Sequence, residues 1–302
     1  MTAEPGLARR AIAGADVAWW QGRRFRQALG RAGLYAVLSL GSVSFLLPFY
    51  YLVNMALSTP EALSKFPPDL IPQPVVLANF WEGWDAYYPF TVFLVNTLTI
   101  TFLSMLGQVL SCTLVAFGFA RVRFPLRRFW FTVLLSTMML PSQVTLIPQY
   151  YIFAKLHWVN TFNPLIVPNW FGSAFYIFLL RQFFMTLPRE LDDAARIDGC
   201  GYLRTLGQVL LPLLKPPLVA VAVFSFVAHW SDFFGPLIYL SDPKKFTMVL
   251  GTTMLVSSFG HSYVNLAYVM AVVTWTVLPV LAIYFWAQRY FIEGIALTGV
   301  RG

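Results

Sequence analysis

Long apolar stretches, each of a length that crosses a lipid bilayer, dominate this 302-residue sequence. Only 11% of the residues are charged, whereas a soluble domain of this size carries about 25% charged residues. A helix needs about 20 mostly apolar residues to cross the hydrocarbon core of a bilayer. Six stretches meet that requirement, at residues 34–57, 89–120, 129–154, 164–184, 213–240 and 265–287. The sequence therefore predicts an all-α membrane protein with six transmembrane helices.

Two of these stretches have features that predict irregular geometry. The stretch 89–120 is too long for a single span, so we expect its helix to tilt or to project from the membrane. Pro141 and Pro148 lie close together in MMLPSQVTLIP and predict a kinked or broken third helix. Bundled membrane helices tolerate such prolines because neighbouring groups satisfy the carbonyl that loses its hydrogen bond.

Basic residues alternate between the loops and so predict the orientation of the chain. Of the 21 Lys and Arg residues, 17 fall in the N-terminal segment, the second and fourth loops and the C-terminal end, and 4 fall in the other loops. Because basic residues collect in cytoplasmic loops, we expect both termini in the cytoplasm of a multi-pass protein of the bacterial plasma (inner) membrane. The net charge of +8 then reflects topology rather than a nucleic-acid partner.

Three regions follow from this topology. We expect a basic cytoplasmic segment at 1–33, a six-helix transmembrane domain at 34–292 and a cytoplasmic tail at 293–302. Arg23 and Arg24 precede an apolar run, as in some export signals. The apolar core of such a signal spans roughly 7 to 15 residues, which is shorter than the run here, so a cleaved signal is the weaker interpretation.

The fourth loop, 186–212, concentrates charge in an otherwise apolar chain. Its first half contains three acids and two alanines that fit the start of a short helix, where the dipole favours negative charge: Glu190, Asp192, Asp193, Ala194 and Ala195. Gly199 and Gly201 interrupt that helix, and a second short helix is expected from 202 to 211, ending near Pro212. The pattern predicts a cytoplasmic helix–turn–helix. Its face of alanines suits close approach by another protein, but an amphipathic hairpin that only anchors the bundle is also consistent with the pattern.

The spacing within this loop is specific. Asp193-Ala194-Ala195 is followed after three residues by Gly199, and after nine more by Val209-Leu210-Leu211-Pro212. This resembles the coupling motif of binding-protein-dependent ABC importers, which is EAA, three residues, G, nine residues, and I-x-L-P. The first position departs from the motif, with Asp in place of Glu, and Val replaces Ile.

The resemblance extends over most of the chain. It is carried by AFGFARVRF (116–124), LIPQYYIF (146–153), IFLLRQFFMTLPREL (177–191) and LAIYFWAQRYFIEGIALTGVRG (281–302). These stretches are similar to the maltose-type sugar permeases, and especially to their shorter six-helix partner subunit; the first 33 residues and the first loop resemble that family least. The resemblance implies a permease subunit that forms half of the path for a sugar or sugar-like solute delivered by an extracytoplasmic binding protein. It also implies, as partners, a homologous second permease subunit and two ATPase subunits that bind ATP and Mg²⁺.

The resemblance also implies roles for particular residues. In that family the fourth-loop helices dock into a cleft on the ATPase subunit, and the corresponding residues here are Asp193, Ala194, Ala195, Arg196, Asp198, Gly199 and Pro212. The outward segment 241–264 corresponds to a region that contacts the binding protein, which implies contacts at Gly260 and His261; a plain connector is the alternative. The tail is expected to reach the ATPase subunits.

Polar residues at membrane depth are candidates for the solute path. An acid within a span is costly and suggests a functional site, but Asp232 could instead cap a broken helix. Trp230 could stack on a sugar ring or pack in the core. Amide side chains also hold membrane helices together. The candidates are Asn96, Gln143, Gln149, Asn169, Trp230 and Asp232.

No group of catalytic residues is recognisable in the sequence. There is no GxxxxGK[ST] phosphate loop, so we do not expect this chain to hydrolyse ATP. The histidines lack the spacing of a zinc site, and Cys112 and Cys200 suit neither a metal site nor a disulfide, so no cofactor or metal is expected on this chain. An ion-coupled secondary transporter is the main alternative, although the spans contain almost no ionisable residues and no repeat is detectable. An intramembrane enzyme is the weakest of the three interpretations, because it would need catalytic groups buried within the spans.

Overall fold

The computed structural model describes residues 23–65, 69–259 and 263–299, and every regular element in these ranges is helical. The predicted all-α class is therefore confirmed. The chain divides into two compact units, residues 1–53 and 54–302, which are described separately. The first unit holds most of α1 (Arg23–Ala56), whose portion Gln27–Ala56 is long and apolar enough to cross a membrane.

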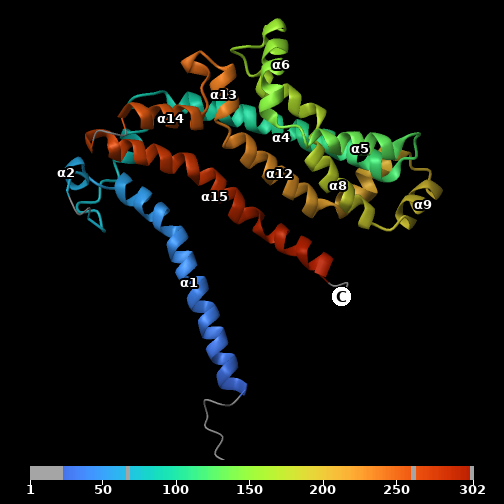
Figure 1. Ribbon diagram of the computed structural model, residues 1–302, viewed down its shortest axis with the longest axis horizontal. Helices are drawn as coiled ribbons and strands as arrows, with labels where there is room; N and C mark the ends of the chain where they lie inside the picture. The colour runs from blue at the N-terminus through green and yellow to red at the C-terminus, as the bar shows by residue number, and fades with distance from the viewer. Residues whose placement is uncertain (1–22, 66–68, 260–262, 300–302) are drawn as a thin grey trace, which may run out of the picture. The chain divides into compact units, whose positions relative to one another are not determined.

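The second unit is built on α4, which runs unbroken over Phe90–Arg121. Its 32 residues extend about 48 Å at 1.5 Å per residue, beyond the roughly 30 Å hydrocarbon core, as predicted. α4 packs against α8 (Ala174–Thr186) and α12 (Lys215–Trp230), and α12 packs against α15 (Tyr263–Gly299), so that α12 lies between α4 and α15 (Figure 1). Two buried apolar clusters, one toward each end of α4, form the core of this unit.

The third predicted span, 129–154, is divided into α5 (Arg127–Thr137) and α6 (Ser142–Lys155). The break falls just before Pro141, because the proline ring and its missing N–H are incompatible with a preceding helical turn. The predicted break is confirmed at this proline, whereas Pro148 lies inside α6 without ending it.

The fourth predicted span, 164–184, is not one helix. It consists of α7 (Asn163–Ile166), the 3-10 turn η2 (Val167–Phe171) and α8. Gly172 separates η2 from α8 with a φ of +88°, and a left-handed backbone cannot continue a right-handed helix. The single helix expected here was therefore wrong, because the glycine was not recognised as a break.

The fifth predicted span, 213–240, is also broken, as the interpretation of Asp232 as a cap implied. α12 ends at Trp230, and α13 begins again at Phe234 and runs to Tyr239. Between α8 and α12 lie four short elements of the fourth loop: α9 (Glu190–Ile197), α10 (Tyr202–Arg204), the π-helical turn η3 (Thr205–Leu210) and α11 (Leu211–Leu213).

The remaining elements lie in the first and fifth loops. They are α2 (Pro60–Leu63), α3 (Asn79–Glu82), the 3-10 turn η4 (Pro243–Lys245) and α14 (Met248–Phe259). The segment 241–264 was expected to be a loop with a short helical piece, and that piece is α14, which is apolar and packs against α4 and α15.

The described residues contain three helices long and apolar enough to span a membrane: the portion of α1 above, α4, and Asn265–Arg289 within α15. A fourth is reached if Tyr202–Leu213 and Lys215–Trp230, bent by 86°, count as one span. The first, second and sixth predicted spans are thus confirmed as helices of sufficient length. The total of six spans remains a prediction, because the others are built from shorter helices.

Candidate functional site

α9 carries opposite charges at its two ends. Glu190, Asp192 and Asp193 lie in its first turn, and Arg196 lies in its last turn. This distribution complements the helix dipole and stabilises a helix of only 8 residues, a length that is marginal in isolation. The predicted position of the acids at a helix N-terminus is confirmed.

The two alanines of the loop motif do not share one face. Ala195 is buried, with 4% exposed, and α9 packs against η3. Ala194 and Asp193 are exposed, and Ile197 is 87% exposed. Successive helical residues point about 100° apart, so a helix that packs on one side can bury one residue and expose its neighbour, as it does here with Ala195 and Ala194. The outer face of α9 is therefore formed by Asp193, Ala194 and Ile197, which corrects the expected alanine face.

Gly199 ends α9 with a left-handed turn. Its φ is +77°, its N–H donates to the carbonyl of Arg196 at 3.0 Å, and the N–H of Cys200 donates to the carbonyl of Ala195 at 2.8 Å. These two bonds form a Schellman motif, in which glycine is preferred because it has no Cβ to oppose the left-handed backbone. The sequence prediction that Gly199 breaks the helix is confirmed, and Asp198 precedes it as the C-cap residue.

The second helix of the loop is less regular than predicted. It runs from Tyr202 through α10, η3 and α11 and ends at Leu213, one residue past Pro212, so the predicted end near this proline is confirmed. In an α-helix Pro212 could not donate to the carbonyl of Gln208 and would clash with it. The wider π turn at η3 accommodates this defect. Leu206 and Leu210 on this helix are buried against the bundle.

A buried ion pair ties α9 to the C-terminal end of α4. Arg121 Nη1 lies 3.4 Å from Asp192 Oδ2, and the two side chains are 6% and 14% exposed. Arg121 Nη2 also donates to the carbonyl of Leu187 at 2.9 Å, just before α9. Removing one partner of a buried pair leaves an uncompensated charge, so this contact fixes the position of α9.

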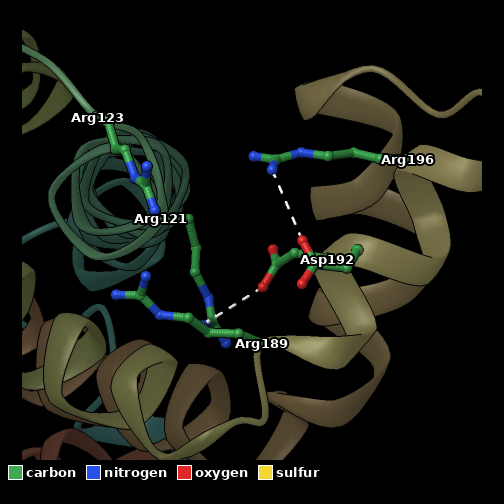
Figure 2. Close-up of a pocket in the computed structure, with 6 residues that line it drawn as sticks. Arg121, Arg123, Arg189, Asp192 and Arg196 are labelled. Atoms are coloured by element: carbon green, nitrogen blue, oxygen red, sulfur yellow. Dashed lines mark ion pairs between the residues drawn. The ribbon is translucent and has the colours of Figure 1, made fainter.

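The two residues of the ion pair line a small cavity of about 100 Å³, which we call the α9 cavity. Figure 2 shows the charged side chains around it, which are Arg121, Arg123, Arg189, Asp192, Asp193 and Arg196. Arg196 Nη1 lies 3.7 Å from Asp193 Oδ1. Within the described part of the chain, Arg123 and Arg189 form no ion pair. The cavity therefore has an excess of positive charge.

Two predicted path residues bond to backbone carbonyls. Asn96 on α4 donates from Nδ2 to the carbonyls of Lys244 and Phe246, at 2.9 and 3.0 Å. Asn169 donates from Nδ2 to the carbonyl of Leu165 at 2.7 Å. The bonds of Asn96 join two distant segments, as is typical of amides in membrane proteins, whereas the bond of Asn169 is local, within α7 and η2.

Trp230 and Asp232 lie at the break between α12 and α13. Trp230 is 2% exposed, stacks on Phe226 with centroids 5.4 Å apart, and donates from Nε1 to the carbonyl of Thr276 at 3.0 Å. Asp232 Oδ1 accepts from the N–H of Gly235 at 3.1 Å, in the manner of a helix cap. In this conformation Trp230 packs in the core and Asp232 stabilises the start of α13.

The other candidates lie elsewhere. Gln143 and Gln149 are exposed on α6, and Gly260 and His261 fall outside the described residues. The role of the predicted path residues in solute passage remains a prediction. Of the predicted motif residues in the fourth loop, those from Asp193 to Gly199 lie on α9 and its terminal turn, whereas Pro212 lies in α11.

Comparison with known families places this geometry in context. Residues 112–296 match the family of binding-protein-dependent transport system inner membrane components. This chain belongs to that family. It is a multi-pass membrane protein and the permease subunit of an ABC importer. The matched region contains α8, α12 and the whole fourth loop.

Relatives and solved structures agree with this assignment. The permease is 33% identical over 266 residues to the sn-glycerol-3-phosphate transport system permease protein UgpE of Yersinia enterocolitica, a match that covers 86% of this chain and 94% of the relative. UgpE of Shigella flexneri is also 33% identical over the same length. A bacterial ABC transporter involved in the import of the acidic polysaccharide alginate has the same fold, with a TM-score of 0.79 and 21% identity, over 89% of this chain and 98% of that one. A second structure, the alginate transporter in complex with a pentasaccharide-bound periplasmic protein, gives a TM-score of 0.62 at 16% identity.

Sequence reasoning missed two contacts within the permease. Arg121 was visible in AFGFARVRF, but nothing in the sequence paired it with Asp192, because the two lie on different elements. Gln108 on α4 was also missed; its Oε1 accepts from Ser225 Oγ at 2.7 Å and lies 3.3 Å from His229 Nε2 on α12. A glutamine inside an apolar stretch was a signal that could have identified this contact between spans.

Proposed function

We propose that this permease forms half of the translocation path for a sugar or sugar-like solute, which an extracytoplasmic binding protein delivers. Relatives named for sn-glycerol-3-phosphate and a structural neighbour named for alginate support this class, because both solutes carry hydroxyl groups. The family description, which includes dependence on a binding protein, supports the delivery step. The ion-coupled alternative finds no support among these relatives.

We further propose that α9 docks on an ATPase subunit and transmits nucleotide-driven motion to the spans. The observation that carries this proposal is that α9 is exposed on one side and fixed on the other. Asp193, Ala194 and Ile197 are exposed, while the Arg121–Asp192 pair ties the helix to α4. A displacement of α9 by a partner would therefore act directly on α4, which packs against α8 and α12.

The complete transporter in this proposal contains a homologous second permease subunit and two ATPase subunits. ATP and Mg²⁺ bind to the ATPase subunits, since this chain has no phosphate loop. Six spans place both termini and the fourth loop in the cytoplasm, with α5 and α6 together forming the third span and α7, η2 and α8 the fourth. The distribution of 17 basic residues against 4 supports this orientation.

Uptake by the reconstituted transporter tests the proposal. Proteoliposomes containing both permeases and the ATPase subunits, supplied with the binding protein, should take up solute only when ATP is present on the ATPase side. Asp193→Lys should weaken ATPase binding and reduce uptake, because it reverses a charge on the exposed face of α9. Glu61→Lys, on the exposed surface of α2, is the matched control and should leave both unchanged.

Two results would contradict the proposal in different ways. Uptake driven by an ion gradient without ATP would favour the secondary transporter. Normal ATPase binding and normal uptake with Asp193→Lys would indicate that the loop only anchors the bundle.

A further inference from the structure

A second group of arginines lies where α5 begins, and none of the functions above uses it. Arg123, Phe124, Leu126, Arg127 and Arg128 line an open pocket of about 420 Å³, which we call the α5 pocket. Three of its five lining residues are arginines and none is acidic, unlike the α9 cavity, in which two aspartates offset four arginines. The α5 pocket is therefore the more suitable of the two for an anionic group.

The turn before α5 presents these arginines. Leu126 has a φ of +57°, a left-handed conformation that is unfavourable for leucine, and its side chain is 68% exposed. Arg127 Nη1 donates to the carbonyl of Val122 at 3.3 Å, which holds one guanidinium across the turn. In the described ranges neither Arg123 nor Arg128 forms an ion pair, so two guanidinium groups retain unused donors.

α5 itself shows which environment the pocket adjoins. No described residue of α5 is buried, and Phe129 and Trp130, which directly follow Arg128, are 55% and 52% exposed. Tryptophan rings settle at the headgroup level of a membrane, so Arg128, two residues before Trp130, lies at a similar depth. The sequence Arg127-Arg128-Phe129-Trp130 thus passes from charge to apolar surface within one helical turn.

We propose that the α5 pocket binds the headgroup phosphate of an anionic phospholipid. Guanidinium groups match phosphate oxygens in geometry and charge, and basic pockets at the ends of membrane helices bind acidic headgroups. The exposed Leu126, Phe129 and Trp130 offer apolar surface to the acyl chains of the same lipid. An acidic segment of a protein partner would need little of this apolar surface, which is why the lipid is the better match. The lipid anchors the start of α5 and, because Arg123 lines both pockets, it lies next to the α9 cavity.

Native mass spectrometry tests this proposal. The full-length permease is released from detergent with added phosphatidylglycerol or phosphatidylcholine, and the lipid that stays bound is measured. Wild-type permease should retain phosphatidylglycerol in preference to phosphatidylcholine, and the preference should weaken as ionic strength rises. A variant with Arg123→Gln, Arg127→Gln and Arg128→Gln should bind phosphatidylglycerol more weakly by roughly fivefold for each arginine, on the order of a hundredfold in all. The corresponding triple change to lysine should retain most of the preference.

A charge-matched control separates the pocket from overall charge. The control variant combines Arg31→Gln, Arg204→Gln and Lys215→Gln, which also removes three positive charges from segments expected on the same side of the membrane. It should retain phosphatidylglycerol as wild type does. Equal retention by wild type and the pocket variant would overturn the proposal, as would an equal loss in the control. Retention by the isolated permease that disappears in the assembled transporter would assign the pocket to a partner subunit instead. Each of these results is independent of whether α9 docks on an ATPase.

Discussion

Gly199 is the residue in the fourth loop whose backbone conformation most restricts its side chain. Its left-handed φ of +77° disfavours a side chain by roughly 1–2 kcal/mol, although the space around its Cβ position is open. Gly199→Leu should therefore leave the purified permease folded but weaken ATPase binding and uptake, because the strain and the added bulk fall on the docking surface. Gly199→Asn is the control, since asparagine tolerates this conformation, and it should retain most activity. Normal uptake and ATPase binding by Gly199→Leu would show that the turn is not part of a docking surface.

The Arg121–Asp192 pair is the second residue-scale feature with a measurable consequence. Asp192→Asn or Arg121→Gln should each lower the stability of the purified permease by about 3 kcal/mol or more, because the remaining charge stays buried without a partner. Thermal unfolding in detergent measures this loss. The exchanged pair, Arg121→Asp with Asp192→Arg, should recover part of it, but not the bond from Arg121 to Leu187. Simple addition of the two single losses in a variant that carries both Asp192→Asn and Arg121→Gln would mean that the side chains do not interact.

At the scale of elements, α4 contains two glycines in contrasting surroundings. A Cβ at Gly107 would lie 2.4–2.5 Å from ring atoms of Trp170 in η2. A Cβ at Gly118, in contrast, would meet nothing within 4 Å. Gly107→Ala should destabilise the permease by about 1–3 kcal/mol, because the ring or the backbone must move. Gly118→Ala should be neutral or stabilising by up to about 1 kcal/mol, since alanine is the better helix former. Thermal unfolding of the two variants measures both changes in stability. Equal changes would mean that α4 and η2 are not in close contact at Gly107.

At the scale of the whole molecule, the six-span topology predicts opposite labelling at two sites. The test starts from a variant in which alanine replaces Cys112 and Cys200. A single cysteine introduced at Gln21 should then react differently with a membrane-impermeant maleimide from one introduced at Glu82. Position 82 should be labelled in intact cells lacking an outer-membrane barrier, and position 21 only after the membrane is opened, because the two lie on opposite sides of the first span. Labelling of position 21 from outside would refute the predicted orientation.

Much of this protein was predictable from the sequence alone, because the signals concerned are local. The apolar stretches that became α1, α4 and α15 required only their length and hydropathy to identify them as spans. Pro141 and Gly199 interrupt helices for reasons carried by the residues themselves, a missing N–H in one case and a missing Cβ in the other. The spacing from Asp193 to Pro212 pointed to the importer family that the comparisons then showed.

The tertiary structure decided what those residues contact. Ala194 and Ala195 are adjacent and chemically identical, yet one is exposed and the other is buried, because only the packing of α9 on η3 determines which side faces inward. Arg121 and Asp192 belong to separate helices, and Gln108 meets His229 across two spans, so each pair exists only because distant segments pack together. Local chemistry can indicate where a helix begins or ends, but the partner of a buried charge depends on which segments the fold brings into contact.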